Sequence, residues 1–158
     1  MRTRTLSTIA LSIVIAASGC GDDGTAPPAP LDVSGVWSYQ APDLVWGPVV
    51  CQMTGVTATL LQSDNTFSGT TTGGVIACQS GETSGSRDLV DYAVTDGSVT
   101  GTSITFTIAS LEQGSDVSIT HVGTVTDNSM SGTVTAQFEL PPPVGAVVPL
   151  TGTWSATR

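Results

Sequence analysis

The chain has 158 residues, which is enough for one domain of ordinary size, and its formal net charge is −9 at pH 7. It contains no lysine, and Arg2 and Arg4 lie at the extreme N-terminus, so that only Arg87 and Arg158 remain against 13 acidic residues in the body of the chain. A surface this acidic repels nucleic acid and anionic headgroups, which argues against polyanion binding. The 25 Thr, 18 Ser and 18 Gly favour pleated strands joined by turns and predict an all-β fold.

Residues 1–19 have the pattern of an export signal. Two arginines precede an apolar segment of 12 residues, Leu6–Ala17, which is shorter than the roughly 20 residues that span a membrane. The segment ends in Ala17-Ser18-Gly19-Cys20, which resembles the lipobox of bacterial lipoproteins, although Ala17 stands where that motif usually has Leu. The resemblance implies that Cys20 is lipidated and begins the mature chain. The alternative is an ordinary secretory signal cut near Ala17, with Cys20 left as a thiol.

We expect residues 20–32 to comprise the lipidated Cys20 and a tether. The segment is rich in Gly and Pro and has no apolar periodicity. Such a tether holds a folded domain away from a membrane. Gly21 occupies the position where some bacteria use Asp as a signal for retention in the inner membrane, so the outer membrane is favoured. We therefore expect a lipid-anchored protein of the bacterial cell envelope, whose first partner is the membrane itself.

The body of the chain repeats a short pattern. The segments 63–70, 95–102 and 126–133 align without gaps, and each carries Asp-Asn or Asp-Gly near its start. These dipeptides suit two-residue hairpin turns, so the pattern predicts hairpins that turn at 64–65, 96–97 and 127–128. The alternative is that a sequence rich in Thr and Gly matches itself by chance.

The first predicted turn has a consequence for the cysteines. A turn at Asp64-Asn65 sets Ser63 opposite Thr66 and, further along the same two strands, Cys51 opposite Cys78. If Cys20 carries the lipid, these are the two remaining cysteines, and in an exported domain such a pair forms a disulfide. We expect the Cys51–Cys78 bond, although a bulge at Gly73-Gly74 would shift the register by one residue.

The other two predicted hairpins differ in how clearly apolar and polar side chains alternate along their strands. A turn at 127–128 places His121 and Val134 on one apolar face and mainly Ser and Thr on the other, with Val122 as the main exception. A turn at 96–97 leaves the apolar residues of its two strands on opposite faces, which a bulge near Thr102-Ser103 would reconcile.

Eight strands in chain order, with no segment of helical period, predict an eight-stranded antiparallel up-and-down β-barrel over residues 33–158. The interior of such a barrel is filled by side chains or holds one small ligand. The predicted strands are 33–40, 51–62, 66–78, 87–95, 98–109, 115–126, 129–139 and 149–158.

Gly35-x-Trp37 on the first strand resembles the Gly-x-Trp signature of lipocalins, and Gly152-Thr153-Trp154 on the last resembles the pattern of avidin-type barrels. Both belong to the calycin-type small barrels, and the resemblance implies eight strands around a site for a small molecule. Lipocalins also carry a helix near the C-terminal end, for which this chain has no segment, so the avidin-type plan fits better. The alternative is that Gly-x-Trp only marks the start of a strand with an aromatic plug.

The sequence shows no pattern for catalysis, a metal or a cofactor, and we expect that the protein is not an enzyme. His121 is the single histidine. On an apolar face it is either a hydrogen-bonded core residue or, in a hollow barrel, a polar contact for a ligand.

Two functions remain open. The first is binding of a small apolar ligand, with five residues as expected contacts: Trp37, Tyr39, Tyr92, His121 and Trp154. The second is a filled barrel that binds or inhibits another envelope or exported protein through two apolar, Pro-rich loops, 41–50 with Trp46 and 140–149. A third connection, 79–86, is polar and is expected to be a loop.

Overall fold

The computed structural model describes residues 30–111, 118–139 and 147–158, which form ten β-strands and no helix. No helix among these residues is long and apolar enough to cross a membrane. The strands are β1 (Gly35–Trp46), β2 (Val49–Ser63), β3 (Thr66–Thr72), β4 (Val75–Ser80), β5 (Thr83–Asp88), β6 (Tyr92–Thr100), β7 (Ser103–Ser110), β8 (Ser118–Val125), β9 (Ser129–Glu139) and β10 (Val147–Thr157).

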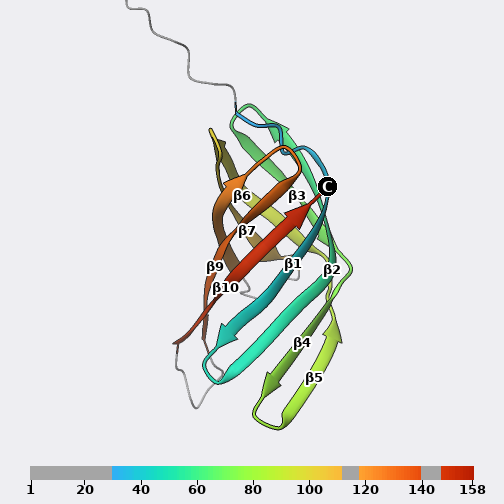
Figure 1. Cartoon of the computed structure of the whole chain (residues 1–158), viewed down its shortest axis with the longest axis vertical. Coiled ribbons are helices and arrows are strands. Elements are labelled where there is room, and N and C mark those ends of the chain that lie inside the picture. The colour runs from blue at the N-terminus through green and yellow to red at the C-terminus, as the bar shows by residue number, and fades with distance from the viewer. Residues whose placement is uncertain (1–29, 112–117, 140–146) are drawn as a thin grey trace, which may run out of the picture.

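Eight of these strands close into an antiparallel barrel, which confirms the predicted fold (Figure 1). The order around the ring is β1-β10-β9-β8-β7-β6-β3-β2, and β2 pairs with β1 to complete it. The first and last strands meet as the closed meander requires, with Tyr39 opposite Ala156. Closure leaves the ring without an unpaired edge.

Strands β4 and β5 lie outside the ring as a hairpin that extends one wall of the barrel (Figure 1). One half of β2 pairs with β3 and the other half with β4, in one continuous antiparallel register. The strand expected at 66–78 is therefore interrupted at Gly73-Gly74, where both glycines adopt positive φ, but the register does not shift. The prediction of a loop at 79–86 is wrong, because these residues form the end of β4, the start of β5 and the turn between them.

The first predicted hairpin is confirmed together with its disulfide. Ser63 lies opposite Thr66 across the Asp64-Asn65 turn, and Asp64 has a φ of 55°. Cys51 lies directly opposite Cys78 on β2 and β4, and the two residues form a disulfide. The bond thus ties the outer hairpin to the ring.

The third predicted hairpin is also confirmed in register and in the faces of its strands. His121 lies opposite Val134, and both side chains are buried. Val122, the expected exception on the polar face, is 51% exposed.

The second predicted hairpin is wrong. Strand β6 runs through Asp96-Gly97 without turning, and the chain turns at Gly101-Thr102 instead. The bulge is at Asp96, which has a φ of 52°, and the register with β7 shifts by one residue between Thr95 and Ser98. Asp-Gly accepts a left-handed backbone in a bulge as well as in a turn, so the dipeptide alone did not distinguish the two.

The contact of Gly97 with Phe67 explains why residues 96–97 form a bulge and not a turn. Gly97 is buried, and a Cβ at this position would overlap the carbonyl oxygen and the ring of Phe67 on β3. The missing side chain allows the two strands to approach closely. The bulge expected near Thr102-Ser103 is therefore not needed, because the shift at Asp96 already places Ile104 on the inner face with Val99.

One end of the barrel, which we call the filled end, is closed by buried side chains. Trp37 is fully buried there and donates a hydrogen bond from Nε1 to the Val33 carbonyl at 2.9 Å. The guanidinium carbon of Arg158 lies 4.5 Å from the centre of the Trp37 ring, and its nitrogens donate to the carbonyls of Ser34, Asp32 and Asp127. A cation over an indole face stabilises this closure.

Candidate functional site

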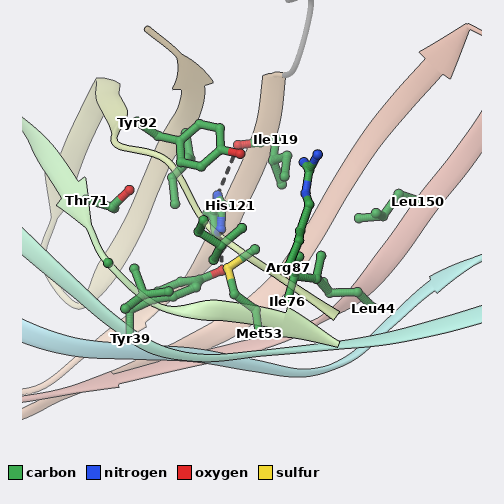
Figure 2. Close-up of a pocket in the computed structure, with 14 residues that line it drawn as sticks. Tyr39, Leu44, Met53, Thr71, Ile76, Arg87, Tyr92, Ile119, His121 and Leu150 are labelled. Atoms are coloured by element: carbon green, nitrogen blue, oxygen red, sulfur yellow. Dashed lines mark hydrogen bonds between the residues drawn. The ribbon is translucent and has the colours of Figure 1, made fainter. Parts of the chain in front are cut away.

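The opposite end, which we call the open end, contains a cavity of about 120 Å³ between the middle of the barrel and the rim (Figure 2). Its walls are mainly aliphatic and come from nearly all strands of the ring together with β4 and β5. The lining residues are Tyr39, Leu44, Met53, Val56, Thr71, Gly73, Ile76, Arg87, Leu89, Tyr92, Ile108, Ile119, His121 and Leu150.

Strand alternation places these side chains inside the barrel. Ile119 and His121 are two residues apart on β8 and therefore share its inner face, while Val122 points outward. On β1 the alternation that buries Tyr39 and Ala41 is shifted by an irregularity before Leu44, and this shift directs Leu44 inward near the rim. An apolar cup with few polar groups is the usual form of a site for a small molecule.

Two hydrogen-bonded side chains form the inner end of the cavity. Tyr39 Oη lies 2.9 Å from His121 Nε2, and His121 Nδ1 lies 3.0 Å from the carbonyl oxygen of Ile119 (Figure 2). A carbonyl oxygen only accepts, so Nδ1 carries the proton. In the neutral imidazole Nε2 then accepts from the Tyr39 hydroxyl. The pair is satisfied internally, and Tyr39 Oη, which uses only its proton in this bond, can still accept a hydrogen bond from a ligand.

Burial keeps both groups neutral. Desolvation lowers the pKa of His121 to about 4, and the hydrogen bond to the Ile119 carbonyl opposes this shift only in part. Burial also raises the pKa of Tyr39 above its usual value. The inner end of the cavity therefore carries no charge at neutral pH.

An aromatic cluster supports this pair from the filled side. The rings of His121 and Phe106 stack with their centres 4.4 Å apart, and Trp154 meets Phe106 edge to face at 5.1 Å. Trp154 also lies parallel to Tyr39 at 6.2 Å. These contacts fix the positions of Tyr39 and His121, because packed aromatic rings have few alternative orientations.

The structure brings together only part of the predicted ligand contacts. Tyr39, Tyr92 and His121 line the cavity. Trp154 is 2% exposed and belongs to the cluster behind the pair, and Trp37 lies at the filled end, so neither lines the cavity. Both tryptophans are structural members of the core rather than walls of the site.

A wider vestibule of about 520 Å³ adjoins the cavity and shares Ile76, Arg87 and Leu150 with it. The Cys51–Cys78 disulfide and Trp46 line its other walls. The inner face of the β4–β5 hairpin thus continues the apolar wall beyond the rim of the ring.

Trp46 does not lie in a loop as expected. It is the last residue of β1, pairs with Val49 and is half-buried, so most of 41–50 belongs to the β1–β2 hairpin. The second apolar loop was expected at 140–149, of which residues 140–146 lie outside the described residues. Docking of a partner protein through these two segments stays a prediction.

Several wall residues escaped the sequence analysis because their segments were taken for loops or strand ends. Leu44 lies in the segment expected as the first apolar loop, and Arg87 at the expected start of a strand that the structure splits into β5 and β6. The alternation of Ile76, Cys78 and the residues opposite them would have predicted one inward face for this hairpin.

Among the residues that the structure describes, no three His, Cys, Asp or Glu side chains gather closely enough to hold a metal ion. No family model matches the chain, and neither a curated protein nor a solved structure shows significant similarity to it.

Proposed function

We propose that the protein is a lipid-anchored component of the bacterial cell envelope whose barrel binds one small, mainly apolar molecule at its open end. The observation that carries the binding proposal is the cavity of about 120 Å³, enclosed by aliphatic side chains and ended by the neutral Tyr39–His121 pair. An apolar cavity of roughly 150 Å³ holds benzene in a well-packed protein. The buried part of the ligand is therefore about the size of a six-carbon group.

The walls and the inner end suit different parts of such a molecule. Met53, Ile108 and Ile119 offer dispersion contacts from three strands. Tyr39 Oη and the hydroxyl of Thr71, which is 3% exposed, supply polar atoms at fixed positions. A hydroxyl or amide on the ligand can use them, but an apolar molecule leaves the Tyr39–His121 bond intact.

Filling the cavity tests this proposal. In Ile119→Phe the larger ring occupies the cavity, whereas Val122→Phe adds a ring to the outer face of the same strand. We expect 1-hexanol to raise the melting temperature of the full chain and of Val122→Phe, since a ligand that binds only the folded state stabilises it. Ile119→Phe should fold and lose this response. An equal response in Ile119→Phe, or none in the wild type, would contradict binding in this cavity.

The anchor rests on the sequence around Cys20. We expect the wild-type chain to carry lipid on Cys20 and to sediment with membranes, and we expect Cys20→Ser to give soluble or uncleaved protein. Mass spectrometry of the purified protein measures the lipid and any small molecule that co-purifies. If Cys20→Ser partitions with membranes as fully as the wild type, the lipoprotein assignment is wrong.

A further inference from the structure

One cationic side chain, Arg87, lies where the cavity meets the vestibule. Arg87 lies on β5 opposite Ile76, on the inner face of the hairpin, and lines both the cavity and the vestibule. Figure 2 shows its side chain extended alongside the cavity, with the guanidinium group at the end away from Ile76. Of the described residues that line these two spaces, it is the only charged one.

Arg87 has no carboxylate partner in the part of the chain that the structure describes, although 13 of the 158 residues are acidic. Asp88 is the next residue on β5 and therefore points to the opposite face of the hairpin. Asp43, near the rim on β1, accepts hydrogen bonds from the backbone N and the hydroxyl of Thr153. Among the described residues, no counter-charge thus faces the guanidinium group across its apolar walls.

Arg158, the other arginine of the barrel domain, has a structural role and serves as a comparison for Arg87. Its nitrogens donate to three backbone carbonyls and its guanidinium covers Trp37. Arg87 makes no such contacts and is exposed. Its donors remain available, and the planar guanidinium fork matches the two oxygens of a carboxylate.

We propose that the ligand is an aliphatic monocarboxylate, with its chain in the cavity and its carboxylate on Arg87 in the vestibule. This inference rests on the proposed function, because it assigns a head group to the molecule whose apolar part fills the cavity. The net charge of −9 repels anions at long range, but at physiological ionic strength this repulsion is screened beyond about 8 Å. The local pair with Arg87 then decides the preference.

Octanoate and 1-octanol form a matched pair of probes, since they share the chain and differ in the charge of the head group. Titration calorimetry uses the full chain in lipid nanodiscs, with empty nanodiscs as the blank. We expect octanoate to bind the wild type roughly tenfold to a hundredfold more tightly than 1-octanol, as charge-assisted hydrogen bonds predict. Added salt should weaken octanoate binding and leave 1-octanol binding unchanged.

Three variants separate the head group from the cavity. Arg87→Gln should lose most of the preference for octanoate over 1-octanol, and Arg87→Lys should retain part of it. Gln52→Glu lowers the net charge by the same amount as Arg87→Gln, but on the outer face of β2, and should change octanoate affinity less than twofold. Melting curves confirm that each variant is folded.

The outcomes distinguish this inference from the proposed function. If Arg87→Gln binds octanoate as tightly as the wild type, or if both probes bind the wild type equally, the carboxylate assignment is overturned while apolar binding in the cavity stands. If the wild type binds neither probe, both proposals fail.

Discussion

His121 is the residue on which the interior of the barrel depends most. It is fully buried, stacks on Phe106 and joins Tyr39 to the carbonyl of Ile119. In the neutral imidazole with its proton on Nδ1, both hydrogen bonds are satisfied. Protonation of Nε2 would require the Tyr39 hydroxyl to turn from donor to acceptor and would place a positive charge in a dry environment.

The stability of the fold should therefore fall as the pH falls from about 6.5 to about 4. In this window the unfolded state binds a proton at His121 that the folded state does not bind, because burial lowers the folded-state pKa from 6.5 to about 4. The shift corresponds to about 3 kcal/mol of unfolding free energy, which is present above pH 6.5 and lost towards pH 4. Urea unfolding at a series of pH values measures it.

A variant isolates the contribution of the histidine. His121→Gln lacks the titrating group, so its unfolding free energy should depend much less on pH between 4 and 6.5, although it is less stable at pH 7. If the unfolding free energies of the wild type and of His121→Gln change equally with pH, His121 is not the group that causes the pH dependence.

At the scale of elements, the β4–β5 hairpin differs from the other strands because it pairs with the ring only through β2. The Cys51–Cys78 bond joins residues 27 apart in the sequence and holds this hairpin in place. In the chain-entropy account a loop of this length contributes about 2–4 kcal/mol.

Replacing both cysteines should therefore lower the unfolding free energy by about 2–4 kcal/mol. Cys51→Ala/Cys78→Ala should also show faster hydrogen exchange in β4 and β5 than in the ring, since local opening begins where few neighbours hold the backbone. Thiol titration of the unfolded, non-reduced chain provides the control. Two or three free thiols would contradict the disulfide.

Register was predictable from the sequence where turn chemistry and side-chain alternation agreed. At Asp64-Asn65 the turn also set Cys51 opposite Cys78, and this coincidence supported both. At Asp96-Gly97 the turn conflicted with the faces of the flanking strands. The conflict arose because Asp96 forms a bulge and not a turn. The bulge depends on the contact of Gly97 with Phe67, and Phe67 belongs to a separate hairpin whose position the local sequence does not reveal.

The candidate site was less predictable than the fold. Tyr39 and His121 could be placed inside the barrel by alternation, and both line the cavity. Their mutual hydrogen bond joins residues 82 apart and depends on the curvature of the closed sheet. Arg87 could not be assigned, because its role depends on the hairpin that extends the wall, and the sequence of that hairpin is polar and resembles a loop.

At the scale of the whole molecule, stability depends on closure by β10. Ending the chain after Pro149 removes most of β10 and exposes edges of β1 and β9. We expect this truncated chain to lose its cooperative thermal melt. A full cooperative melt would contradict closure by the C-terminal strand.

Single substitutions refine this prediction. Trp154→Ala and Trp37→Ala each remove a buried ring and should cost about 3–5 kcal/mol, a large part of the stability of a small domain. Trp46→Ala, in the half-buried wall of the vestibule, should leave the melt nearly unchanged and weaken ligand binding.

The filled end is also where the described chain enters and leaves the barrel. Arg158 donates from its backbone to the Asn128 carbonyl and from its side chain to Asp32, so both ends of the domain lie beside each other, opposite the rim at Trp46 and Leu150. If Cys20 anchors the protein, as we propose, the attachment joins the barrel at the end opposite the mouth. The anchor then leaves the mouth free to exchange its ligand with the aqueous compartment instead of holding it against the leaflet.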